Sequence, residues 1–174
     1  MQNILLISGS LRKDSLNTKL LKAFESLLTE DVNVNWANIM LPLFNQDLEK
    51  DFPIDAQKFR DQILAAGSVI IATPEYNRGM PGVLKNAIDW ASRPYGQNSF
   101  AGKRVLVTSA SPGSIGGALA SYQVKQSLLH LDARVIGHPE CIFGHAGDIF
   151  NEEGELVDEK AQKIITKAIR NLQE

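Results

Sequence analysis

The stretch that decides the fold is Ile4-Leu5-Leu6-Ile7-Ser8-Gly9-Ser10-Leu11-Arg12-Lys13-Asp14-Ser15-Leu16-Asn17-Thr18. Its first four residues form an apolar run with the length of a strand that is buried on both faces, as in a parallel sheet. Apolar residues then recur at helical spacing at positions 20, 21, 24, 27 and 28, so we expect a helix to begin near Asn17. The connecting loop therefore ends at a helix N-terminus, where free main-chain N–H groups and the helix dipole favour an anion.

Two interpretations of this loop stay open on its residues alone. In the first, Ser15 and Asn17 cap the helix and Gly9 makes the turn. In the second, the hydroxyl groups of the loop and the planar guanidinium of Arg12 bind a phosphate. The glycine patterns of dinucleotide-binding and P-loop proteins are both absent after this strand. The donor set therefore fits a single terminal phosphate better than a pyrophosphate.

Length and composition indicate one soluble domain spanning residues 1–174, with 44% apolar and 22% charged residues. A formal net charge of -2 gives no electrostatic reason to expect a nucleic acid or a membrane as partner. Cys141 is the only cysteine, which favours a reducing compartment. Strand-like sequence directly after residues 1–3 leaves no room for a signal peptide, and no apolar segment is long enough to span a membrane. We therefore expect a cytoplasmic protein.

Strands and helices alternate along the rest of the chain. Further strands are predicted at 32–36, 68–72, 104–108 and 134–136, with 141–143 as a candidate continuation of the last. Helices are predicted from Ile54 to Gly67, between Pro81 and Pro94, from Ala118 with Leu119, Tyr122 and Leu129 as its apolar positions, and over 161–172. This alternation predicts an α/β fold with a parallel sheet and helices on both faces. Loops 8–17, 73–80 and 109–117 each follow a strand, so we expect them to share one edge of the sheet.

Two motifs resemble those of the NADPH-dependent FMN reductases of the flavodoxin-like superfamily. Residues 9–17, GSLRKDSLN, resemble the family's G-S-x-R-x-x-S-x-N phosphate loop. Residues 74–90, PEYNRGMPGVLKNAIDW, resemble its long P-E-Y-N signature and lie between a predicted strand and a predicted helix. The resemblance implies a flavodoxin-like, doubly wound, five-stranded parallel sheet of order 2-1-3-4-5, bound FMN, and a homodimer or homotetramer.

The resemblance also implies which residues contact the cofactor. The FMN phosphate would be held by Ser10, Arg12, Ser15, Leu16, Asn17 and Thr18, with side-chain hydrogen bonds from Ser10, Ser15 and Asn17. The isoalloxazine ring would lie along Pro74, Glu75, Tyr76 and Asn77, contacted mainly by main-chain groups. The loop 109–117, including Ser111 and Gly113, would approach the pyrimidine end of the ring. Arg78 is a candidate for binding the phosphates of the nicotinamide nucleotide.

The predicted activity is transfer of electrons from NADPH or NADH through FMN to a small-molecule acceptor, such as a quinone, an azo or nitro aromatic, or an oxidised metal anion. Because the cofactor carries this chemistry, we assign no catalytic side chain. We assign no metal site either, since His130, His138 and His145 lack ligand spacing. Cys141 is interpreted as a small buried apolar residue. Two alternatives are a flavodoxin-type electron carrier, whose usual T-x-T-G-x-T loop is missing here, and a flavin-free phosphosugar or nucleotide binder.

Overall fold

The apolar run at residues 4–7 forms the middle of β1 (Gln2–Ser8), an interior strand of a parallel sheet. The computed structural model describes residues 2–174; Met1, where the predicted domain begins, lies outside the described residues. β1 pairs in parallel with β2 (Val32–Trp36) on one side and with β3 (Ser68–Ala72) on the other. β3 pairs in turn with β4 (Arg104–Ala110), which pairs with β5 (Arg134–Val135). The predicted strand order β2-β1-β3-β4-β5 is confirmed.

The fifth predicted strand is divided into two short strands. β5 pairs with the first residues of β4, and β6 (Cys141–Phe143) pairs with its last residues, Thr108 to Ala110. The described chain thus has six strands in one sheet. Pro139 lies between β5 and β6 and has no N–H to donate to a ladder, which explains the interruption.

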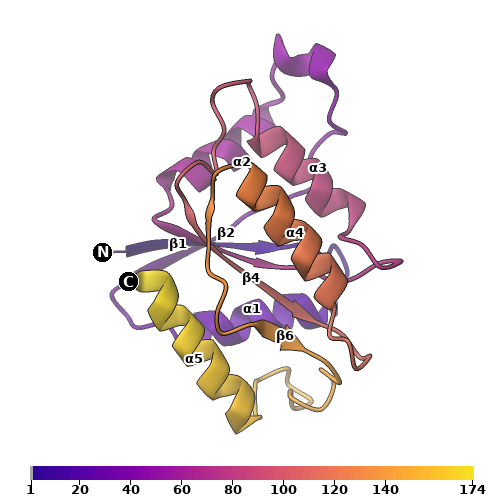
Figure 1. Cartoon of the computed structure of the whole chain (residues 1–174), viewed down its shortest axis with the longest axis vertical. Helices are drawn as coiled ribbons and strands as arrows, with labels where there is room; N and C mark the ends of the chain where they lie inside the picture. The colour runs from indigo at the N-terminus through magenta and orange to yellow at the C-terminus, as the bar shows by residue number, and fades with distance from the viewer. Residues whose placement is uncertain (1) are drawn as a thin grey trace.

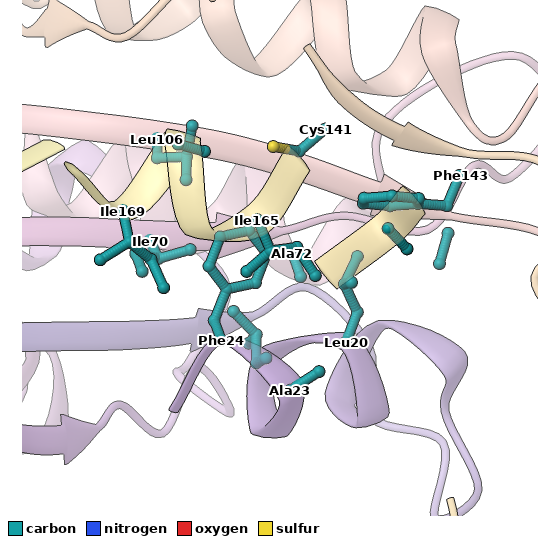
Figure 2. Close-up of a cluster of buried hydrophobic side chains, with 14 of the residues drawn as sticks. Leu20, Ala23, Phe24, Ile70, Ala72, Leu106, Cys141, Phe143, Ile165 and Ile169 are labelled. Carbon is teal, nitrogen blue, oxygen red and sulfur yellow. The ribbon is translucent and has the colours of Figure 1, made fainter. Parts of the chain in front are cut away.

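Helices cover both faces of the sheet (Figure 1). α1 (Leu16–Ser26) and α5 (Glu159–Gln173) pack on one face. α2 (Ile54–Ala65), α3 (Gly82–Ala91) and α4 (Ala118–His130) pack on the other. Successive strand residues point to opposite faces, so Leu6 and Ile70 belong to the first core while Leu5 and Val69 belong to the second. Figure 2 shows side chains of the first core, among them Phe24 of α1 and Ile165 of α5.

The predicted helix that begins at Ala118 is confirmed as α4, but the apolar positions named for it, Leu119, Tyr122 and Leu129, are all exposed. The buried residues of α4 are instead Ala120, Ser121, Val124 and Leu128. The helix carries apolar residues on two sides, so its sequence pattern does not reveal which side faces the sheet. Ile54, where the second helix was predicted to begin, is the first residue of α2 and is exposed.

The segment between β2 and α2 contains the short 3-10 helix η1 (Gln46–Glu49), which projects at the top of Figure 1. Two residues of the long signature hold its first part against α3. Trp90 Nε1 and Asn86 Nδ2 both donate to the main-chain oxygen of Pro42, at 2.7 and 3.0 Å. The main-chain N–H of Phe44 donates to Asn86 Oδ1 at 2.7 Å. Asn86 and Trp90 therefore have a structural role. Across residues 2–174 no helix has the length and apolarity to cross a membrane.

Candidate functional site: three loops at the carboxyl edge of the sheet

The three predicted loops leave adjacent strands at the same edge of the sheet. Gly9, at the end of β1, donates its main-chain N–H to the oxygen of Ala72 at the end of β3, at 2.7 Å. Thr73, the next residue, donates to the oxygen of Thr108 in β4 at 2.9 Å. Because β1, β3 and β4 are parallel neighbours, the loops that follow them open on one side. The prediction that they share one edge is confirmed.

The first loop requires glycine at position 9. A Cβ built there would lie 3.0 Å from Leu84 Cδ2 and 3.1 Å from the oxygen of Ala72. These distances are shorter than normal contacts, and one of the two atoms belongs to the main chain of β3. The absence of a side chain therefore lets the loop pass directly over the start of the second loop.

Hydroxyl groups and the guanidinium of Arg12 gather in this loop. Ser8 Oγ and Thr18 Oγ1 lie 2.9 Å apart and share a hydrogen bond. Ser10 Oγ accepts from the N–H of Arg12 at 3.2 Å, and Ser15 Oγ accepts from the N–H groups of Asn17 and Thr18, which makes Ser15 the N-cap of α1. As acceptors in these bonds, Ser10 and Ser15 keep their hydroxyl protons for an anion. Arg12 is exposed and forms no ion pair within the described chain.

Leu16 and Asn17 occupy the first turn of α1. Leu16 packs its side chain against the first core, so only its main-chain N–H is available to an anion. Asn17 is 3% exposed, and both polar ends of its side chain are bonded to Ala110 at the end of β4. The Asn17 side chain, which was expected to donate a hydrogen bond to a phosphate, is thus bonded to the main chain of β4.

The second loop contains a tight two-residue turn. The main-chain groups of Tyr76 and Gly79 exchange two hydrogen bonds of 3.0 Å. Between them, Asn77 and Arg78 have φ angles of 51° and 65°, as required at both central residues of a type I′ turn. Pro74 is buried at the base of the loop, whereas Tyr76 and Asn77 are exposed at its tip. The turn fixes the direction in which these exposed residues point.

Glu75 connects this turn to α4, a contact that sequence reasoning missed. Its Oε2 accepts from the N–H groups of Leu119 and Ala120, at 3.0 and 3.2 Å, and its side chain is 11% exposed. Its Oε1 lies 3.5 Å from Arg78 Nη1. A carboxylate is favoured at a helix N-terminus because it satisfies free N–H groups and the dipole. The available signal was Gly117, the N-cap of α4, which has no side chain with which to cap the helix.

The third loop is held against β6 and the turn that follows it. Ser111 donates its N–H to the oxygen of Phe143 at 3.1 Å and accepts from the N–H of Ala146 at 3.0 Å. Gly113 donates to Ser111 Oγ at 3.2 Å and is exposed. Gly116 has a φ of 68°, and a Cβ there would meet the nitrogen of Gly144 at 2.8 Å. The loop is therefore held against β6 and the turn that follows it, while Gly113 is exposed to solvent.

Cys141 is a free, buried thiol in β6. Burial raises its pKa to about 12, so the nucleophilic thiolate is suppressed at neutral pH. The interpretation of Cys141 as a small buried apolar residue is confirmed. Among residues 2–174 no cluster of three or more histidine, cysteine, aspartate or glutamate side chains could hold a metal ion.

Comparison with known proteins identifies close relatives. The sequence model of the family described as NADPH-dependent FMN reductase matches residues 2–148. A quinone reductase of Pseudomonas putida is 45% identical over 140 residues, which cover 79% of this chain and 75% of that protein. A 2-hydroxy-1,4-benzoquinone reductase of Burkholderia sp is 45% identical over 138 residues, with the same shares.

Solved structures are similar to this chain over nearly its whole length. FerB, a flavoenzyme NAD(P)H:(acceptor) oxidoreductase from Paracoccus denitrificans, is 39% identical, with a TM-score of 0.92 over 99% of this chain and 96% of that one. An FMN-dependent NADH-azoreductase from Bacillus anthracis in complex with FMN has a TM-score of 0.67 at 15% identity, over 100% of both chains, and is similar in fold alone.

Proposed function

Because the chain belongs to the NADPH-dependent FMN reductase family, we propose that it is an FMN oxidoreductase whose acceptor is a quinone. The choice of quinone is supported by the names of relatives that are 45% identical to it, a quinone reductase and a 2-hydroxy-1,4-benzoquinone reductase. Azo and nitro aromatics and oxidised metal anions are the other acceptors predicted from the resemblance. NADPH and NADH are both candidate electron donors.

The first loop fits the phosphate end of FMN. Its donors are hydroxyl groups, main-chain N–H groups at the start of α1, and the unpaired cation of Arg12. A dianionic phosphomonoester needs such donors, since each hydrogen bond to a charged group contributes about 1.5–3 kcal/mol. We assign the phosphate to Ser10, Arg12, Ser15 and Thr18 and to the main-chain N–H of Leu16.

The second loop (73–80) and the third loop (109–117) fit the isoalloxazine-ring end of FMN. When bound, FMN would supply the redox chemistry, which is acceptance of a hydride equivalent from the nicotinamide and transfer of electrons to the acceptor. We assign the rigid turn at Pro74, Glu75, Tyr76 and Asn77 to the ring, with Tyr76 offering an exposed aromatic face. The loop 109–117, which contains Ser111 and Gly113, would approach the pyrimidine end, where N–H donors stabilise negative charge. These residues bind and orient the ring, and none of them transfers a proton in our proposal.

The observation that carries the proposal is the direct bonding of the three loops at one edge. Gly9 bonds to Ala72, Thr73 bonds to Thr108, and Glu75 caps α4. A phosphate-binding loop is thereby fixed relative to a turn and to a third, glycine-containing loop. An elongated ligand with an anionic end and a flat end matches this arrangement.

An absorbance spectrum of the purified protein, with identification of any released flavin, tests the proposal. We expect bound FMN, anaerobic bleaching of its absorbance by NADPH or NADH, and steady-state turnover with a panel of quinones. A flavodoxin-type carrier would bind FMN without being bleached directly by either nucleotide. A colourless protein that takes up no FMN would overturn the proposal and favour a flavin-free phosphate binder.

We also propose that the chain forms a homodimer or homotetramer through the outer face of α4. Leu119, Tyr122 and Leu129 expose apolar surface there, at spacings that place them on one side of the helix, and Ile115 is exposed in the loop that precedes it. Exposed apolar patches of this kind mark interaction surfaces. A cytoplasmic location stays a prediction.

A further inference from the structure

Asn17 joins the first turn of α1 to the last residue of β4. Its Nδ2 donates to the oxygen of Ala110 at 3.0 Å, and its Oδ1 accepts from the N–H of Ala110 at 2.9 Å. The two residues are 93 positions apart in the sequence, and both are 3% exposed. A side-chain amide, with a donor and an acceptor side by side, thus pairs with both main-chain groups of one residue.

The geometry of the sheet explains why Ala110 needs this partner. Thr108, two residues earlier, turns its oxygen toward β3 and accepts from Thr73 there. Ser111, one residue later, turns its N–H toward β6 and donates to Phe143. Ala110 therefore faces the β3 side, like Thr108. However, β3 ends at Ala72, and the chain leaves the sheet through Pro74.

Without Asn17, the main-chain groups of Ala110 would be buried and unpaired at this position. An unsatisfied buried polar group is costly, so the amide of Asn17 completes the sheet where β3 has already ended. This use of the side chain also accounts for its burial. A phosphate ligand would be expected to present its amide to the open side of the loop.

We propose that Asn17 is a positioning residue, which fixes the loop 111–117 relative to the phosphate loop, instead of a phosphate ligand. The third loop begins directly after Ala110, and the phosphate loop ends directly before α1. The bonds between Asn17 and Ala110 therefore set the distance between the two ends of the flavin site. This inference rests on the FMN site proposed above.

Flavin binding with and without the phosphate separates the two roles. We would titrate FMN and riboflavin into the apoprotein by flavin fluorescence, for the wild type, Asn17→Ala and Asn17→Leu. A positioning role predicts that both variants lose affinity for both flavins by the same factor, about tenfold. The matched control is Arg12→Ala, which should lose affinity for FMN alone. Loss of FMN affinity with riboflavin affinity unchanged, or no loss for either flavin, would overturn the inference.

The midpoint potential of bound flavin distinguishes positioning from a loss of overall stability. If the third loop moves, fewer N–H donors reach the pyrimidine end, so reduced flavin is less stabilised in the Asn17 variants. We expect their midpoint potential to be more negative than that of the wild type, and that of Arg12→Ala to be unchanged. An unchanged potential in folded Asn17 variants would contradict the inference.

Hydrogen exchange on the wild-type protein tests the same bond if the variants do not fold. The Ala110 N–H should exchange slowly in the apoprotein, because Asn17 and not the cofactor protects it. Fast exchange that slows only when FMN binds would overturn the inference. A wild-type protein that binds neither flavin would overturn the proposed FMN function. Slow exchange of the Ala110 N–H would even then support its hydrogen bond to Asn17.

Discussion

At the scale of single residues, Arg12 lies in the proposed phosphate loop and forms no ion pair with a carboxylate of the described chain. Arg12→Ala should therefore weaken FMN binding by about tenfold or more, since charge-assisted hydrogen bonds contribute about 1.5–3 kcal/mol each. Fluorescence titration of the apoprotein measures the effect, with Lys13→Ala, its exposed neighbour, as the control. Equal FMN affinity in Arg12→Ala and the wild type would mean that the phosphate is bound elsewhere.

Arg78 is the corresponding cation of the second loop. Its side chain is 65% exposed, and its pairing with Glu75 holds it beside the turn. If it binds the phosphates of the nicotinamide nucleotide, Arg78→Ala should raise the KM for NADPH about tenfold and leave FMN affinity unchanged. Arg78→Lys, which keeps the charge, should recover part of this loss. Steady-state kinetics measure the KM for NADPH in each variant. An unchanged KM in Arg78→Ala would show that Arg78 does not bind the nucleotide.

Sequence reasoning identified candidate residues of the proposed site more readily than the residues that these candidates contact within the protein. Ser10 and Arg12 follow from their spacing within one loop, because the groups involved are close in the chain. The bonds of Asn17 to Ala110 and of Glu75 to Leu119 span 93 and 44 positions. Such pairings depend on where β3 ends and where α4 begins, and a local pattern does not encode either. Asn17 and Glu75 were therefore predicted as cofactor contacts, and their roles inside the protein emerged only from the fold.

At the scale of elements, the loop between β4 and α4 contains two glycines with opposite requirements. Gly116 has a φ of 68°, and a Cβ would lie 2.8–2.9 Å from Gly144, Ile142 and Phe143. Gly113 has space, because its Cβ would meet only Ser111 Oγ at 3.7 Å. Gly116→Ala should thus displace the loop from β6 and destabilise the protein by about 1–3 kcal/mol, whereas Gly113→Ala should have little effect on stability.

Urea denaturation of the two alanine variants, followed by circular dichroism, measures this difference. The flavin affinity of Gly116→Ala should fall as well, since the loop that it displaces belongs to the proposed ring end. Comparable stability of the two variants would show that the loop adapts without cost.

The elements themselves were predictable to different degrees. The fully apolar runs of β1 and β3 identified these strands because both of their faces are buried. The division of β5 from β6 was less accessible, since it depends on pairing with two different parts of β4. The apolar positions named for α4 did not identify its buried face, because the helix has a second apolar side that its own sheet does not cover.

At the scale of the whole molecule, the two sides of α4 have different roles. The buried side stabilises the fold, and we propose that the exposed side contacts a second copy of the chain. Leu128 is fully buried against the second core, and its neighbour Leu129 is 61% exposed. Leu128→Ala should lower the free energy of unfolding by about 2–5 kcal/mol through the cavity that it leaves. Leu129→Ala should cost much less, because it removes few core contacts. Equal losses in urea denaturation at a concentration where the protein is monomeric would contradict the assignment of the buried face.

Association through the outer face of α4 would explain why this helix carries apolar residues that the fold of a single chain leaves exposed. If a second copy of the chain covers this face, a charge placed there must be desolvated on association, which is unfavourable without a partner. Leu129→Glu should therefore shift the protein to a smaller mass in multi-angle light scattering while its thermal unfolding remains cooperative. Tyr95→Glu is the control, because Tyr95 is exposed outside α4. A Leu129→Glu protein with the same mass as the wild type would exclude this face as the subunit contact, and the apolar side of α4 would need another binding partner.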